Sequence, residues 1–270
     1  MPEVYMIKIG GGSITDLEKP RTARRDVISR LLQEIYDAQK EKGFSAIIGH
    51  GSGSFGHVTA SEYKVSEGLI GPDSMKGAVL TKVVASELNF IVIDEAVKLG
   101  IPIFPFFPSS FALAEGRKLK SGFVEHIATV MRRGFIPLVH GDVVVDEKQG
   151  ISIASTEEVL RFIATKIPVK KVVLATDVDG IYDKDPNKNS DAKLVEKVNQ
   201  SNIDDVISGA SVAHKVDVTG GMKTKVSILY DIVRSGNGTT GHILNAQKPG
   251  VLKSVLTGAN GVRHTEITVQ

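Results

Sequence analysis

The chain of 270 residues contains no cysteine, so neither a disulfide framework nor a thiolate metal site can form. It also lacks an excess of either charge: 33 lysine and arginine residues face 31 aspartate and glutamate residues, a net charge of +2. This balance excludes a global attraction to nucleic acid or to an anionic membrane, although it leaves room for a local basic patch. With 41% hydrophobic and 24% charged residues, the composition is typical of a globular protein and excludes a disordered or collagenous chain.

The sequence also has no apolar run long enough to cross a bilayer. One apolar-rich uncharged stretch, Leu99 to Ala114, is too short to span a bilayer and is interrupted by Pro102, Pro105 and Pro108. No basic region followed by a long apolar stretch begins the chain, so we expect no typical secretory signal. We therefore expect a cytoplasmic protein that binds neither membrane nor nucleic acid. No fixed-period repeat or linker-like segment is present, which favours a single domain over residues 1–270.

Strand-like and helix-like segments alternate along the chain. Short apolar runs predict strands, and apolar residues at helical spacing predict the longer helices. The expected strands lie at 4–9, 44–48, 101–104, 135–139, 171–175, 241–244 and near 262–269, with a hairpin over 141–153. The expected helices cover 21–42, 75–99, 121–133, 155–166 and 220–235. This alternation predicts an α/β fold with a mostly parallel sheet covered on both faces, in which ligands bind beyond the carboxyl ends of the strands.

The first predicted strand ends in a glycine-rich loop with the sequence Lys8-Ile9-Gly10-Gly11-Gly12-Ser13. Glycines let backbone N–H groups approach an anion closely, and a following helix N-terminus adds favourable partial charge. Lys8, just before the loop, is placed to neutralise a phosphoryl group. Taken alone, a tight turn with an exposed lysine explains this segment equally well.

A second glycine-rich loop, GHGSGSFGH at 49–57, follows the second predicted strand. Gly51, Gly53 and Gly56 match G-x-G-x-x-G, the motif of dinucleotide-binding dehydrogenases. That fold requires a further strand with an acidic residue about 20 residues later, but polar sequence and a glycine–proline turn follow His57. His57 lies beside backbone donors and could bind a phosphate oxygen, although a structural or surface histidine is the commoner case.

Two later segments have the same polar, glycine-containing character. TDVDGIYDKDP at 176–186 leaves a hydrophobic strand and enters a polar loop, as a nucleotide-binding crossover does. DVTGGMKTK at 217–225 places two glycines at a helix start, with Lys225 about one turn inside the helix and Thr219 available as its cap. Glu157 and Glu158 begin another predicted helix, whose dipole favours carboxylates there. The sequence contains no G-x-x-x-x-G-K-[ST], H-E-x-x-H or G-x-S-x-G motif, which excludes P-loop enzymes and leaves metalloprotease and hydrolase chemistry unsupported.

Together, the Lys8 loop, GHGSGSFGH, TDVDGIYDKDP and DVTGGMKTK resemble the amino acid kinase family, in the same order from residue 4 to about 245. The GSFGH ending and the DVTGG segment are similar to those of the isopentenyl phosphate kinases and the fosfomycin kinases, and RTAR at 21–24 resembles the former. The resemblance implies an open αβα sandwich that transfers the γ-phosphate of ATP directly to isopentenyl phosphate. It further implies Mg²⁺ held mainly by ATP oxygens, a homodimer, an acceptor-binding part at about 1–165 and a nucleotide-binding part at about 166–270.

The same resemblance assigns roles to individual residues. The implied catalytic set is Lys8, Lys225, His57 and Glu157; the lysines flank the transferring group, Glu157 organises them, and His57 binds the acceptor phosphate. The implied nucleotide-binding residues are Gly10, Gly11, Gly12, Ser13, Asp177, Tyr182, Lys184, Asp185, Pro186, Gly220 and Gly221. The implied acceptor-binding residues are Ser52, Gly53, His57 and Thr156. No residue is assigned as a direct metal ligand.

The chain departs from the family pattern at three places. Ser52 stands where glycine is usual, Ser155-Thr156-Glu157-Glu158 replaces Ser-Gly-Asp-Asp, and Leu17 stands where a lysine is frequent, with Lys19 nearby. Glu157 then takes the role of an aspartate with one extra methylene, and Thr156 is expected to narrow the acceptor site or to remove a backbone contact. Two alternatives stay open: a kinase for another small phosphate or phosphonate such as fosfomycin, or a nucleotide-binding sensor without catalysis.

An isoprenoid acceptor also requires an apolar pocket for its tail. Met75, Val79 and Val83 share one side of the helix predicted after the His57 loop, so they are candidates for its wall. Ordinary core packing is the simpler expectation for at least two of these three side chains.

Overall fold

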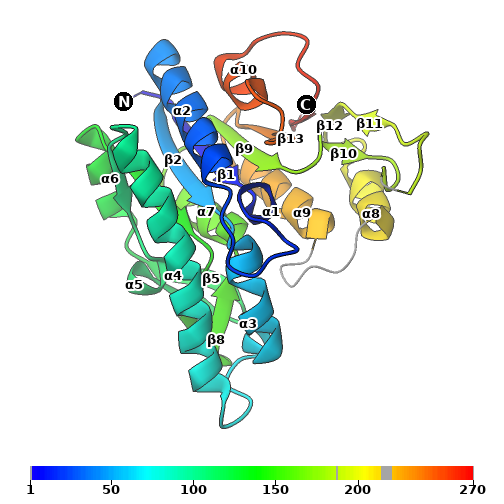
Figure 1. Ribbon diagram of the computed structural model, residues 1–270. Helices are drawn as coiled ribbons and strands as arrows, with labels where there is room; N and C mark the ends of the chain where they lie inside the picture. Colours follow the sequence, from blue (N-terminus) through cyan, green and yellow to red (C-terminus); the bar gives the residue numbers. More distant parts are fainter. Residues whose placement is uncertain (1, 187, 214–220, 270) are drawn as a thin grey trace.

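The computed structural model describes residues 2–186, 188–213 and 221–269 (Figure 1). In this part of the chain, the main sheet has eight strands in the order β12-β14-β13-β9-β1-β2-β6-β3. In that order the strands span Lys197–Val198, Thr265–Ile267, Thr240–Asn245, Lys171–Thr176, Val4–Ile9, Ser45–His50, Ile136–His140 and Ile103–Pro105. All neighbours from β13 to β3 pair in parallel, whereas β14 runs antiparallel to β13. The predicted α/β fold with a mostly parallel sheet is confirmed.

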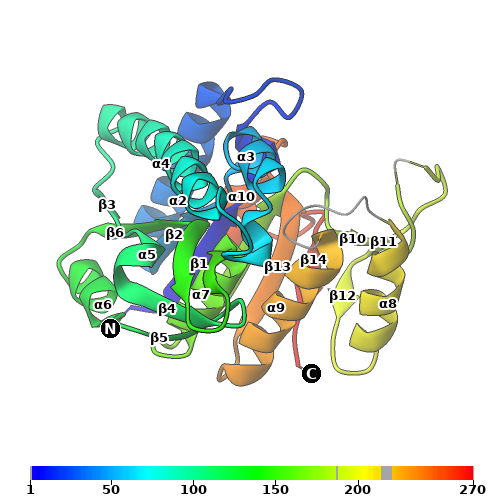
Figure 2. The same cartoon turned by 90° about the horizontal axis from the view of Figure 1, so that it is seen from below.

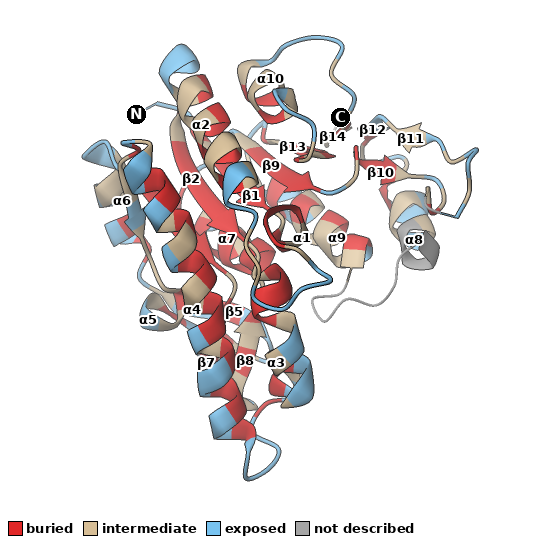
Figure 3. Ribbon diagram, viewed as in Figure 1, coloured by how far each residue is buried: buried red, intermediate tan, exposed pale blue. Residues whose placement is uncertain are grey.

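Helices cover both faces of this sheet, as Figure 2 shows. On one face lie α2 (Arg25–Lys42), α4 (Ser74–Lys98) and α10 (Val251–Thr257). On the other lie α7 (Thr156–Ala164) and α9 (Gly221–Ser235), with α6 (Glu125–Arg132) packed against β6. The central strands are buried between the two layers (Figure 3), which is why they consist of nearly continuous apolar runs.

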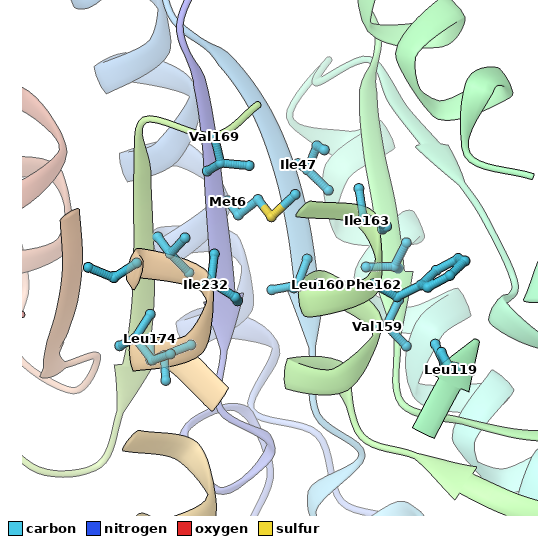
Figure 4. Packing of buried hydrophobic residues seen from close by; sticks show 14 of the residues in the cluster. Met6, Ile47, Leu119, Val159, Leu160, Phe162, Ile163, Val169, Leu174 and Ile232 are labelled. Carbon is cyan, nitrogen blue, oxygen red and sulfur yellow. The ribbon is translucent and has the colours of Figure 1, made fainter. Parts of the chain in front are cut away.

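The alternation of side chains along each strand decides what each face receives. In β1, Met6 packs into the core under α7 and α9, whereas Ile7 packs into the core under α2 and α4. Figure 4 shows Met6 and Ile47 of the sheet close to Leu160 of α7. Lys8, two residues after Met6, therefore emerges on the face that carries α7 and α9.

A second sheet of four strands lies beside the main one, in the order β5-β4-β7-β8. Its strands span Lys118–Gly122, Ala112–Glu115, Asp142–Asp146 and Gly150–Ala154. The antiparallel pair β7–β8 confirms the hairpin predicted over 141–153. The remaining elements are α1 (Gly11–Ile14), η1 (Gly53–Phe55), α3 (His57–Glu62), η2 (Val65–Glu67), α5 (Pro108–Phe111), α8 (Ile203–Ala213), β10 (Ile181–Tyr182) and β11 (Leu194–Val195).

The predicted boundaries differ from the structure mainly at short elements. The helix predicted over 121–133 begins only at Glu125, because 118–122 form β5, and the helix predicted from residue 21 begins at Arg25. The stretch between β9 and α9 contains α8 and three short strands where a loop was expected. Elements this short are marginal in isolation and depend on packing, which sequence periodicity does not report. Among the helices of the described residues, none combines the length and apolar composition needed to cross a bilayer.

Candidate active site

A cavity of about 500 Å³ lies at the carboxyl ends of β1, β2 and β9. Parallel strands present the loops that follow them at one edge of the sheet, so the glycine-rich loops meet there. The first turns of α7 and α9 complete the cavity. The sequence-predicted residues that line it are Lys8, Gly10, Gly11, Gly12, Ser13, Ser52, Gly53, His57, Thr156, Glu157, Asp177, Gly221 and Lys225.

Lys8 and Glu157 form a buried ion pair in the cavity wall. The Lys8 Nζ lies 2.9 Å from the Glu157 Oε1, and their side chains are only 5% and 8% exposed. Burial would raise the pKa of Glu157, but the charges of Lys8 and Lys225 and the hydrogen bond from Lys8 together hold that pKa below its usual value. Glu157 is therefore a carboxylate at neutral pH and acts as a fixed negative charge rather than a proton donor.

Lys225 reaches the same cavity from α9. Its positive charge acts on the Glu157 carboxylate, as that of Lys8 does. One carboxylate thus faces two lysines from opposite ends of the chain. The three groups together keep one positive charge in the cavity, which suits an anionic phosphoryl group.

The two glycine-rich loops pack directly against each other. A Cβ at Gly11 would lie 2.2 Å from the backbone nitrogen of Gly53, so no side chain fits at this contact. Gly53 itself has a φ of +49°, a conformation that favours glycine. Thr15 joins the loops, because its hydroxyl donates to the Gly11 carbonyl at 2.8 Å and accepts from the Ser54 N–H at 3.0 Å. The glycines therefore serve loop packing as well as access for a ligand.

The side chains of α4 that were expected to form the apolar wall of the cavity do not do so. Met75, Val79 and Val83 neither line the cavity nor pack in the core; all three are exposed. Both interpretations made for them were wrong, because α4 carries apolar residues on its outer side as well. The side chains of α4 that line the cavity are Thr81 and Ala85, and further apolar walls come from Ala60, Val143 and Ile153. Small residues on this side gave no strong hydrophobic signal in the sequence.

The residues predicted to bind the nucleotide are only partly assembled. Asp177 and Gly221 line the cavity, but Tyr182, Lys184, Asp185 and Pro186 belong to the neighbouring segment around β10 and are not part of its lining. The Tyr182 hydroxyl lies 3.4 Å from Asp179 Oδ2, and Lys184 pairs with Asp191 at 2.5 Å. Gly220 lies outside the described residues.

The departures from the family pattern have distinct outcomes. Thr156 is buried, and its hydroxyl donates to the His50 carbonyl at 2.7 Å, so the side chain is tied to β2. Ser52 lines the cavity next to Gly56. Leu17 also lines the cavity, whereas Lys19 is not part of the lining and its ammonium lies 4.0 Å from Asp16 Oδ2.

A pair of buried histidines behind the second loop was not identified from the sequence. His50 and His140 end the neighbouring strands β2 and β6, and their rings stack with centroids 5.7 Å apart. Burial and then the neighbouring His140 lower the pKa of His50 to about 4, and burial also lowers the pKa of His140. Both rings are neutral at pH 7 and add no charge beside Lys8. Their position at strand ends was the available signal.

A chain of polar contacts that sequence analysis also missed supports the first loop. The Gln247 side-chain amide donates to the Ser13 carbonyl at 2.9 Å. The Asn245 Oδ1 accepts from the Gln247 N–H at 2.9 Å, and the Asn245 amide donates to Asp179 at 3.1 Å. Asn245 ends β13 and Gln247 follows it, so the rule that ligands bind beyond the carboxyl ends of strands could have pointed to them.

The amino-acid sequence is similar to those of known kinases over nearly its full length. The model of the amino acid kinase family matches residues 3–245. The isopentenyl phosphate kinase of Methanothermobacter thermautotrophicus is 32% identical over 98% of this chain and 99% of that kinase. The isopentenyl phosphate kinase of Methanocaldococcus jannaschii is 30% identical over 97% of both chains.

Solved structures agree with these relations. A crystal structure of an isopentenyl phosphate kinase superposes with a TM-score of 0.82 and 29% identity, covering 98% of this chain and 100% of that one. The carbamate kinase of Giardia lamblia shares the fold, with a TM-score of 0.70 at 12% identity over 100% of this chain and 99% of that one. The family resemblance inferred from the motifs is confirmed: the chain belongs to the amino acid kinase family.

Proposed function

We propose that this kinase transfers the γ-phosphate of ATP to isopentenyl phosphate and releases ADP and isopentenyl diphosphate. The observation that carries the proposal is the Lys8–Glu157–Lys225 cluster in one cavity with two glycine-rich loops. The near full-length relation to isopentenyl phosphate kinases supports the choice of acceptor. No observation favours either alternative, a kinase for fosfomycin or a nucleotide-binding sensor without catalysis.

The transfer is a direct displacement between two anions. An oxygen of the acceptor phosphate forms a bond to the γ-phosphorus while the bond from that phosphorus to the β,γ-bridging oxygen breaks, and ADP leaves. Lys8 and Lys225 balance the charge that builds up on the transferring group, and Glu157 holds Lys8 in position. The backbone N–H groups of Gly11 and Gly12 would bind phosphate oxygens, whereas the Gly10 N–H already donates to the Ala175 carbonyl at 2.7 Å and so anchors the loop to β9. His57 and Gly53 would bind the acceptor phosphate. The chemistry requires positioning and charge, not a covalent enzyme intermediate.

The acceptor tail would lie against the apolar part of the cavity. Ala60, Ala85, Val143 and Ile153 line this part and leave room for a short branched hydrocarbon. Asp142 also lines the cavity, but Lys82 neutralises its carboxylate at 2.9 Å. This composition favours isopentenyl phosphate over an acceptor whose tail carries a further charged group.

Mg²⁺ would enter this site with ATP. Within the described ranges, no group of three or more His, Asp or Glu side chains could hold a metal ion. The cavity nevertheless contains the carboxylate of Asp177, whose oxygens are the ligand type that Mg²⁺ prefers. Such a donor set fits a metal that keeps most of its ligands from ATP and water, where it would reduce the charge repulsion between the reacting phosphates.

A coupled assay of ADP release tests the proposed acceptor. The purified chain is supplied with ATP and Mg²⁺ and, separately, with isopentenyl phosphate, dimethylallyl phosphate, fosfomycin or UMP. We expect the highest kcat/KM with isopentenyl phosphate. Faster turnover of fosfomycin or UMP would overturn the acceptor assignment, and ATP binding without turnover of any acceptor would favour the sensor.

His57→Ala is expected to raise the KM for isopentenyl phosphate about tenfold or more while changing the KM for ATP about twofold at most, since one hydrogen bond to a charged group contributes about 1.5–3 kcal/mol. His57 lines the cavity at the start of α3, beside the second loop and away from β10. His126→Ala, on the exposed side of α6, is the matched control. Equal increases in both KM values would argue against acceptor binding by His57.

We further propose that the protein is a homodimer that uses α4. The outer side of α4 exposes a stripe of five apolar side chains, Met75, Val79, Val83, Phe90 and Val97. The last three repeat every seven residues, the spacing at which two helices pack along each other. Sedimentation analysis should show a dimer for the native chain and a shift to monomer for Phe90→Asp. Phe123→Asp, at another exposed phenylalanine, before α6, should stay dimeric; the same state for all three proteins would contradict the use of α4.

A further inference from the structure

Thr156 is a buried polar residue in the cavity lining whose hydroxyl bonds to the protein backbone. Its side chain is tied to the end of β2, because the hydroxyl donates to the His50 carbonyl at 2.7 Å. The residue is 2% exposed. It is also the first residue of α7, directly before Glu157. A hydrogen bond at this place joins the start of the helix to the strand that leads into the second glycine-rich loop.

The methyl group of Thr156 occupies a space that one glycine keeps open. A Cβ on Gly49 would lie 2.6 Å from the Thr156 Cγ2, whereas its next contacts, Val139 and Leu160, are at ordinary distances of 3.5 and 3.6 Å. The strand register pairs Gly49 with Lys8 on the adjacent strand β1. The Thr156 methyl group therefore packs on the sheet beside the residue to which Glu157 must reach.

Through these contacts the main sheet holds both Lys8 and Glu157 in place. Lys8 is held by β1, which pairs with β2 and β9 on either side. Glu157 is held by the first turn of α7, which contacts β2 through the hydroxyl and the methyl group of Thr156. The long glutamate side chain has more rotatable bonds than an aspartate, so its carboxylate is placed well only if its backbone is fixed.

From this geometry we propose that Thr156 is a positioning residue: packed on Gly49 and bonded to the His50 carbonyl, it fixes the first turn of α7 so that Glu157 holds Lys8 in line with the transferring phosphoryl group. The inference rests on the proposed phosphoryl transfer. Thr156 acts through Glu157, and its role differs from the acceptor contact expected from the sequence.

Two substitutions disturb this contact from opposite sides. Thr156→Val keeps the shape but removes the donor to the His50 carbonyl. Gly49→Ala keeps the donor but pushes the Thr156 methyl group away. Each is expected to lower kcat at saturating ATP and isopentenyl phosphate by about 10- to 100-fold, because a shift near 1 Å in a catalytic group has effects of this size. The KM for ATP should change little, and any fall in the melting temperature should leave the protein folded at the assay temperature.

The decisive measurement is the double variant Gly49→Ala/Thr156→Ser. Serine keeps the hydroxyl and lacks the methyl group, so it makes room for the new Cβ and should restore most of the kcat lost in Gly49→Ala. If Thr156 had a purely structural role, Gly49→Ala would lower the melting temperature, and the double variant would not restore kcat. Gly71→Ala, where a Cβ would meet nothing within 4 Å, is the control for a glycine substitution as such.

Three results would overturn the proposal: a normal kcat in Thr156→Val, no rescue in the double variant, or a rise in the KM for isopentenyl phosphate without a fall in kcat. The last result would return Thr156 to the acceptor site. Should the native chain prove inactive on isopentenyl phosphate, the proposed function fails by itself. In that case ¹³C NMR titration of the Glu157 carboxyl still tests Thr156, since Thr156→Val should raise the pKa of Glu157 if the contact with Lys8 loosens, and no change would refute it.

Discussion

Replacing Lys8 by alanine is expected to lower kcat at least about 100-fold, and replacing Lys225 should have an effect of similar size. Both lysines reach the cavity in which Glu157 is buried. A positive charge in a site shielded from water stabilises a transferring phosphoryl group far more than the same charge would in bulk water. The loss should therefore fall on kcat rather than on the KM for ATP.

Both variants should remain folded. Breaking a buried ion pair usually costs about 3–5 kcal/mol, because the remaining charge is left without a partner. Glu157 interacts with Lys8 and with Lys225, so either single variant leaves one cation near the carboxylate. The destabilisation should accordingly lie below that range, and a domain of ordinary stability can absorb it.

Steady-state kinetics and thermal unfolding of the same preparations check this prediction. Lys197→Ala removes an exposed lysine on β12, far from the cavity lining, and serves as the control for the loss of one charge. Near-normal kcat in both Lys8→Ala and Lys225→Ala would exclude the charge-stabilising role. A fall in kcat that merely follows the fraction of unfolded protein would show that the lysines act on stability alone.

Gly11→Ala should lower kcat/KM for both substrates by about 100-fold or more, because the two glycine-rich loops have to separate. The new Cβ would lie 2.2 Å from the Gly53 nitrogen and 2.8 Å from its Cα, and backbone cannot turn aside as a flexible side chain does. We also expect a loss of about 1–3 kcal/mol in the free energy of unfolding, as is usual for overpacking.

Gly12→Ala provides a matched comparison at the next residue. A Cβ at Gly12 would meet only the Leu17 side chain, at 3.4 Å, and the backbone N–H group is retained. Its loss in kcat/KM should stay within about tenfold, since the loop contact is untouched. Similar losses in the two variants would mean that the glycines serve the approach of a phosphate rather than the packing of one loop on the other.

Local spacing in the sequence was sufficient to predict the central layers of the fold. The strands β1, β2, β6 and β9 contain buried apolar runs, and the carboxyl-end rule located the cavity at the loops that follow three of them. The wall formed by α4 was assigned to the wrong side of the helix. Helical periodicity identifies apolar stripes, but α4 has one on each side, and only packing distinguishes them.

The functional motifs follow the same division. Three features could be recognised from neighbours within a few residues: Lys8, the glycines after β1 and β2, and the start of the helix that carries Glu157. The sequence alone was therefore enough to find them. Their partners could not be found in this way. The Lys8–Glu157 pair joins positions 149 residues apart, and the Thr156–His50 hydrogen bond joins positions 106 apart.

Contacts between residues so far apart in the sequence form only when the strands pair in register and the helices pack on the faces of the sheet. The strand register places Gly49 beside Lys8, and the packing of α7 then brings Thr156 into contact with Gly49. The sequence therefore predicted which residues would be functional, because local steric and electrostatic rules govern glycine-rich loops and helix starts. Which of them touch was settled by the folded chain, because strand pairing and close packing act between segments that the sequence keeps far apart.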